Sequence, residues 1–154
     1  MTVVIGLGNP LRADEGIGVR IVQGLEARPE EERRDVRLLD IGTAGLRLLD
    51  ALSGADRAII VDCTLMGEEP GTMLRFTRED VASRRDRASL GPHSGDLLHY
   101  VDLAASLGES PSEIVFFGIE PASLDYREEL SPQLEARLPL YLERIAREIE
   151  RMRA

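Results

Sequence analysis

The stretch TVVIGLGNPLRADEGIGVRIVQGLEA, residues 2–27, combines a short apolar run with an amphipathic segment. Residues 2–8 are rich in β-branched side chains and end in glycine followed by Asn-Pro, which is typical of the end of a buried strand. Over residues 15–27 the apolar side chains recur every four positions, which is typical of a helix with one buried face. The recurring positions are Ile17, Ile21 and Leu25. The stretch therefore predicts a strand followed by a helix.

The same alternation continues downstream. Residues 35–41 predict a second strand, residues 42–45 a turn into a leucine-rich helix, and residues 57–63, RAIIVDC, a third buried strand. The order strand–helix–strand–helix–strand is typical of parallel strands joined by right-handed crossovers. We therefore expect these three strands to lie parallel in one sheet.

The second half of the chain changes its pattern. Residues 72–77 alternate like an edge strand that can run antiparallel to its neighbour. The polar, arginine-rich residues 78–92 predict a long loop. A helix is expected over residues 94–107, with Ser94 as its N-cap, and residues 113–119, EIVFFGI, predict the last core strand. This half therefore adds two strands and one helix before the carboxyl-terminal segment.

A final helix is predicted to begin at Ser131-Pro132, since proline is favoured at the first helical position. Pro139 is expected to kink or restart this helix. Its predicted buried stripe consists of Leu134, Leu138, Leu142, Ile145 and Ile149. Taken together, the elements predict the α/β fold class. We expect a three-layer α/β/α sandwich around a five-stranded, mostly parallel sheet, forming a single domain over residues 1–154.

The composition disfavours several classes of protein. The chain has 154 residues, with 28 acidic and 19 basic ones, all of the basic ones arginine, and a formal net charge of −9. Such an acidic chain is poorly suited to phosphate backbones and anionic membranes, so we expect no nucleic-acid binding and no membrane insertion. The one cysteine excludes an internal disulfide or a CxxC site. Without a bilayer-length apolar run or a signal-peptide pattern, we expect a cytoplasmic monomer.

Three polar residues lie at the ends of predicted elements, where α/β folds bind ligands. Glu15 begins the first helix, Asp62 ends the third strand, and His93 precedes the helix expected from Ser94. Loops at the carboxyl ends of parallel strands share one edge of the sheet, so these side chains can meet there. Two carboxylates and an imidazole suit a divalent metal such as nickel, zinc or iron, with coordination positions left open. The same trio can also activate water to attack a carbonyl group.

Each of these residues also has a purely structural interpretation. Asp14 and Glu15 can cap a helix and complement its dipole, and Asp62 is of a type common in turns at strand ends. His93 can be a loop residue that is hydrogen-bonded to backbone. Cys63 follows Asp62 and is therefore expected on the opposite face of the strand, as a buried and unreactive thiol.

Six segments of the sequence carry a resemblance to a known family. They are GLGNPLRADEGIGVR (6–20), DIGTAG (40–45), IIVDC (59–63), PGTM (70–73), PHSGDL (92–97) and GIEP (118–121). With them the chain resembles the nickel–iron hydrogenase maturation endopeptidases over essentially its whole length. The first segment is the most specific, because an Asp-Glu pair followed by a small residue and then Gly-Val rarely arises by chance. The resemblance implies an αβα fold and metal binding by Glu15, Asp62 and His93.

The resemblance also implies a reaction and a partner. Members of this family remove a short carboxyl-terminal extension from the precursor of the nickel–iron hydrogenase large subunit once nickel is in its active site. Glu15, Asp62 and His93 provide only three ligands and no thiolate, so we expect the large subunit to supply the nickel. Nickel would then serve as the recognition element, and zinc or cadmium should also bind this trio. The catalytic water is activated either by metal or by a carboxylate.

Two other functions are open on the sequence. A nickel carrier or sensor would bind metal without cleaving anything, although two histidines in the chain argue against storage. A small-molecule hydrolase would need an apolar, aromatic-lined pocket, which the 4% aromatic content makes less attractive. Asp40, at the end of the second strand, is either a further carboxylate of the site or the residue that enters a Gly-Thr turn.

Overall fold

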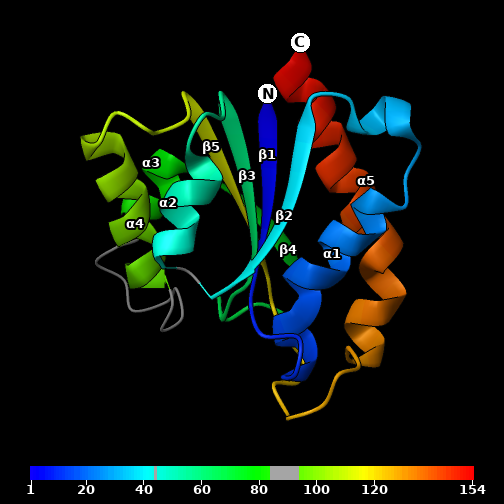
Figure 1. The fold of residues 1–154 in the computed structure, drawn as a ribbon. Helices are drawn as coiled ribbons and strands as arrows, with labels where there is room; N and C mark the ends of the chain where they lie inside the picture. The colour runs from blue at the N-terminus through cyan, green and yellow to red at the C-terminus, as the bar shows by residue number, and fades with distance from the viewer. Residues whose placement is uncertain (44, 84–93) are drawn as a thin grey trace.

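The computed structural model describes residues 1–43, 45–83 and 94–154 (Figure 1). Its sheet consists of β1 (Thr2–Leu7), β2 (Val36–Gly42), β3 (Arg57–Cys63), β4 (Met73–Thr77) and β5 (Glu113–Ile119). The strand order is β2-β1-β3-β5-β4. β2, β1, β3 and β5 are parallel, whereas β4 pairs antiparallel with β5 at one edge. The predicted five-stranded, mostly parallel sheet is confirmed, including its antiparallel edge strand.

Helices cover both faces of this sheet, as Figure 1 shows. One layer consists of α1 (Ile17–Glu26) and α5 (Pro132–Arg153). The other consists of α2 (Leu46–Leu52), α3 (Arg78–Ser83) and α4 (Ser94–Ser106). Two short 3-10 helices, η1 (Ala13–Gly16) and η2 (Glu30–Arg33), lie in the connections on either side of α1. The predicted α/β/α sandwich is therefore confirmed.

Alternation of side chains along β3 divides the core into two clusters. Ile59 and Val61 pack with apolar residues of α1 and α5, whereas Ala58 and Ile60 pack with those of α2, α3 and α4. Successive side chains of a strand point to opposite faces, which is why β3 contributes to both clusters. All four side chains are buried. Burial on both faces explains why the sequence of β3 contains a continuous apolar run.

The helix after β1 begins later than the sequence suggests. We expected it from residue 15, but residues Ala13–Gly16 form the 3-10 helix η1, and α1 begins at Ile17 with Gly16 as its N-cap. Ala13 has a φ of 47°, a left-handed conformation that is uncommon outside glycine. This turn redirects the chain between β1 and α1, so the helix cannot start earlier.

Part of the predicted loop over residues 78–92 is helical. Arg78–Ser83 form α3, which begins with a reciprocal capping pair between Thr77 and Asp80. The amide of Thr77 donates to Oδ2 of Asp80 at 2.9 Å, and the amide of Asp80 donates to Oγ1 of Thr77 at 3.2 Å. This pair satisfies two amides at the helix start, and its spacing is visible in the sequence. Residues 84–92 lie outside the described residues.

The final helix does not restart at Pro139, which was one of the two alternatives that the sequence suggested. α5 runs from Pro132 to Arg153 with Pro139 inside it. Pro139 and Glu135 are both exposed, so the Glu135 carbonyl that loses its usual amide partner faces water. The predicted start is confirmed, because Ser131 Oγ accepts a hydrogen bond from the amide of Leu134. In the described part of the chain, no helix combines the length and apolar character needed to cross a membrane.

Candidate functional site

The carboxyl ends of the parallel strands share the lower edge of the sheet in Figure 1. Asp62 is the penultimate residue of β3 at this edge. Glu15 lies in η1, which follows β1 and contacts β3. The structure therefore brings together two of the three side chains that the sequence predicts as a site. The third, His93, lies outside the described residues, and α4 begins directly after it at this same edge.

Glycines allow η1 to approach the strand ends closely. Gly8 has a φ of +117°, and a Cβ atom there would lie 2.0 Å from the backbone oxygen of Glu15. A Cβ atom at Gly18 would lie 2.5 Å from the carbonyl oxygen of Leu7. Any side chain at either position would push η1 and α1 away from β1. These two glycines thus hold the backbone of Glu15 against the sheet edge.

The Glu15 carboxylate has one charged partner. Glu15 is only 9% exposed, and its Oε2 lies 3.2 Å from Nη1 of Arg12. The Arg12 guanidinium also lies over the ring of Tyr126, 5.3 Å from its centroid. Tyr126 belongs to the loop between β5 and α5, whose Arg127 forms a backbone bridge with Arg12. This loop and Glu15 are thereby coupled through a single arginine.

Asp62 is in a less favourable environment for its charge. Burial is the largest cause that raises the pKa of Asp62 to about 7; a backbone hydrogen bond at Cys63 opposes it, and the negative charge of Glu15 adds a smaller increase. A carboxyl group with a pKa near neutrality can take up or release a proton at physiological pH. Its interaction with Glu15 also shows that the two carboxylates lie in one electrostatic environment. Such a pair of carboxylates attracts a cation and can accept or donate a proton.

Asp14, adjacent to Glu15, has a different role. It is fully buried, and Oδ2 accepts hydrogen bonds from the amides of Ala122 and Ser123 at 2.8 and 3.0 Å. Oδ1 accepts from the amide of Ser131 at 2.7 Å. The expectation that Asp14 caps the following helix is wrong, because the N-cap of α1 is Gly16 and no side chain caps it. Asp14 instead fastens the loop between β5 and α5 to η1.

Glu120 is a buried carboxylate that the sequence analysis missed. Its Oε1 accepts hydrogen bonds from the amides of Met66 and Glu68, at 2.9 and 2.8 Å. These amides belong to the loop that follows Asp62, so Glu120 fixes the shape of the chain beside the site. The signal was available, because Glu120 directly follows β5 just as Asp62 stands at the end of β3.

Asp40 and Cys63, two further residues near the site, have surroundings that are typical of a structural role. Asp40 is exposed, and its Oδ1 accepts a hydrogen bond from the amide of Gly42 at 3.3 Å, as expected of a residue that enters a turn. Cys63 packs against the cluster beneath α1 and α5, on the face opposite to that of Asp62. Burial raises the pKa of the Cys63 thiol, with further increases from Asp62 and other nearby carboxylates. Cys63 is half-buried rather than fully buried, and its raised pKa disfavours the thiolate form that reacts.

The predicted ligands of a metal at this edge of the sheet are Glu15, Asp62 and His93. Within residues 1–43, 45–83 and 94–154, no three histidine, cysteine, aspartate or glutamate side chains gather closely enough to hold an ion. Glu15 and Asp62 provide carboxylate oxygens, which suit divalent cations but leave most coordination positions open. The described residues thus supply two of the three predicted ligands, since His93 lies outside them.

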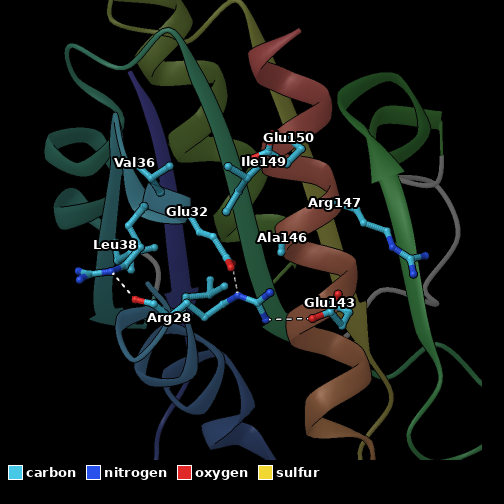
Figure 2. A pocket seen from close by; sticks show the side chains of 11 residues that line it. Arg28, Glu32, Val36, Leu38, Glu143, Ala146, Arg147, Ile149 and Glu150 are labelled. Atoms are coloured by element: carbon cyan, nitrogen blue, oxygen red, sulfur yellow. Dashed lines mark hydrogen bonds and ion pairs between the residues drawn. The ribbon is translucent and has the colours of Figure 1, made fainter. Parts of the chain in front are cut away.

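A groove of about 400 Å³ lies elsewhere, between the end of α1, η2, β2 and the second half of α5 (Figure 2). Its floor is apolar, and Arg28 lies across it with ion pairs to Glu32 and Glu143. Neither Glu15 nor Asp62 lines it. This groove is therefore separate from the candidate site.

The comparison with known proteins agrees with the geometry. The model of the hydrogenase maturation protease family matches residues 19–148. The chain belongs to this family. Its members are peptidases, so the predicted family and enzyme class are confirmed.

Individual members resemble the chain over most of its length. It is 35% identical over 147 residues to the hydrogenase 2 maturation protease of Escherichia coli K12, covering 93% of this chain and 87% of that protein. It is 36% identical over 137 residues to the hydrogenase expression/formation protein HupD of Thiocapsa roseopersicina, covering 88% of this chain and 62% of HupD. The solved structure of the hydrogenase maturating endopeptidase HybD from E. coli aligns with a TM-score of 0.81 at 33% identity, covering 98% of this chain and 93% of that one.

Proposed function

We propose that this chain removes the carboxyl-terminal extension of the nickel–iron hydrogenase large-subunit precursor after nickel has been inserted, and that it does so in the cytoplasm. The observation that carries the proposal is the pairing of Glu15 and Asp62 at the carboxyl edge of the sheet, in a member of the hydrogenase maturation protease family. Two interacting carboxylates with few counter-charges form a site for a cation and for proton transfer.

Nickel acts in this proposal as part of the substrate. Glu15, Asp62 and His93 fill some of the open coordination positions of a nickel ion that the precursor already holds. This shared coordination places the scissile peptide beside the two carboxylates and gains the advantage of an oriented, near-intramolecular reaction. Without nickel in the precursor the bridging bonds are missing, so an immature precursor is not cleaved.

The chemistry is hydrolysis of one peptide bond. A water molecule, activated either by the precursor's nickel or by a carboxylate of the site, bonds through its oxygen to the scissile carbonyl carbon and gives up a proton. The carbon–nitrogen bond then breaks, and the proton passes to the departing amine. Glu15 and Arg12 stay in place as the electrostatic surroundings of this transfer.

The test is cleavage of nickel-loaded and nickel-free precursor, followed by mass spectrometry in the presence of a chelator that removes free ions only. We expect loss of the extension from the nickel-loaded precursor alone. Equal rates on both precursors would show that nickel is not the recognition element. A stable complex with nickel-loaded precursor but no loss of mass would instead indicate a nickel carrier or sensor.

A further inference from the structure

Exposed large apolar side chains are concentrated in the loops that follow the parallel strands. Among the described residues, seven such side chains are exposed, and four of them lie just beyond the carboxyl ends of the four parallel strands. In strand order from β2 to β5 these are Leu46 (72% exposed), Leu11 (56%), Leu65 (48%) and Tyr126 (84%). Each parallel strand thus leads to one exposed apolar side chain at the edge that carries Glu15 and Asp62.

These four residues, here called the apolar rim, adjoin the acidic pair. Neighbouring strands lie about 4.8 Å apart, so three spacings place the four strand ends within roughly 15 Å. Tyr126 contacts Arg12, which pairs with Glu15. Leu65 follows Asp62 by three residues, in the loop that Glu120 fixes. Two members of the rim, Leu65 and Tyr126, therefore lie in loops that adjoin the candidate site.

The remaining exposed apolar residues are located differently. Leu107 follows α4 at the opposite edge of the sheet, Leu140 lies within α5, and Met1 is the first residue. Single exposed apolar side chains are common on any protein surface and need no explanation. A set of four around one site is informative, because exposed apolar residues with a tyrosine and an arginine are typical of protein–protein contact surfaces.

We propose that the apolar rim is the docking surface for the folded body of the large-subunit precursor, beside the tail that is cut. This inference rests on the proposed function. A precursor whose tail reaches Glu15 and Asp62 must cover the loops around them, so the rim is continuous with the site that a protein substrate has to reach. The rim also lies on loops that follow four different strands, whereas a single extended peptide is about as wide as one strand spacing of about 4.8 Å.

The experiment compares two sets of matched variants on full-length, nickel-loaded precursor. One carries Leu11→Ser, Leu46→Ser, Leu65→Ser and Tyr126→Ser, and the control carries Leu107→Ser and Leu140→Ser. We expect the rim variant to raise KM by about tenfold or more, with kcat within about threefold, because loss of central contacts weakens association more than chemistry. The control variant should keep both constants. Unfolding midpoints are measured for both, and two double rim variants replace the quadruple one if it does not fold.

Three outcomes separate this inference from the proposed function. If the unchanged protein cleaves the precursor and the rim variants have the same KM, the rim is not a docking surface. The proposed function is then unaffected. No cleavage by the unchanged protein overturns the proposed function. A dimer in sedimentation experiments that the rim variant abolishes assigns the rim to a second copy of the chain and also overturns the inference.

Discussion

Acidic side chains have different neighbours at the two ends of this molecule. Around the second half of α5, arginines and carboxylates pair with each other: Arg75 and Arg151 both donate to Glu148, and Arg28 pairs with Glu32 and Glu143. At the carboxyl edge, Asp62 is half-buried beside another acid, and its pKa is raised to about 7, chiefly by burial. The first arrangement lowers the energy of the folded chain, whereas the second raises it.

Glu148 and Asp62 show what this difference teaches. Glu148 is buried and Asp62 is half-buried, and removal from water acts to raise the pKa of each. At Glu148 the hydrogen bonds from Arg75 and Arg151 outweigh burial, so the net effect lowers the pKa. At Asp62 no side chain of the described residues lowers the pKa, and the backbone hydrogen bond at Cys63 does not outweigh burial. An acid that costs stability in the folded state points to a functional site more strongly than one that is neutralised.

The largest expected effect is on cleavage. Asp62→Asn or Glu15→Gln should slow cleavage of the nickel-loaded precursor by roughly a thousandfold, since each change removes one of the two interacting charges. Asp40→Asn is the matched control, because Asp40 is an exposed carboxylate with a turn hydrogen bond. Its rate should stay within about threefold. Single-turnover rates that are equal in all three variants would place the chemistry elsewhere.

The next effect is on folding stability. Asp14→Ala should lower the free energy of unfolding by about 2 kcal/mol, because it leaves the buried amide of Ser131 and the part-buried amides of Ala122 and Ser123 without their acceptor. Denaturant unfolding measures this loss, and Asp40→Ala should cost less than about 0.5 kcal/mol. A loss for Asp14→Ala no larger than that of the control would mean that Asp14 does not fasten the loop.

The carboxylates also show how far sequence reasoning reaches. The fold followed from the alternation of apolar strands with helices, and Glu15 and Asp62 followed from their places at element ends. Position alone does not separate Asp14 from Glu15, since both stand at the same turn. Their separation depends on a loop more than 100 residues away that donates its amides to Asp14. Glu120 was missed because its hydrogen-bond donors, Met66 and Glu68, are likewise remote in sequence.

The pH dependence of stability should have opposite signs for Glu148 and Asp62. The lowered pKa of Glu148 contributes stability above its unfolded pKa of 4.5, which is lost as the pH falls through the folded value. The raised pKa of Asp62 imposes a cost that is full above about pH 7 and disappears as the pH falls towards its unfolded pKa of 3.8. Glu148→Gln should therefore destabilise at pH 7, and Asp62→Asn should stabilise, each by about 1–3 kcal/mol.

Unfolding free energies of these variants and the unchanged protein, measured with chelator from pH 4 to 8, check both signs. The raised pKa of Asp62 predicts that Asp62→Asn gains stability at pH 8 and that this gain vanishes near pH 4. A difference from the unchanged protein that is constant across this pH range would show that Asp62 keeps an ordinary pKa.

The smallest effect is expected at the groove of Figure 2. Arg28→Ala removes ion pairs with Glu32 and Glu143, both of them substantially exposed. Exposed pairs contribute little, because water screens them and side-chain entropy opposes them, so the loss should stay below about 1 kcal/mol. It should shrink further in 1 M salt. Cleavage should be unchanged, since the groove lacks Glu15 and Asp62. If Arg28→Ala slowed cleavage tenfold while the free energy of unfolding was unchanged, the groove would take part in the reaction. The functional difference between the groove and the carboxyl edge would then not hold.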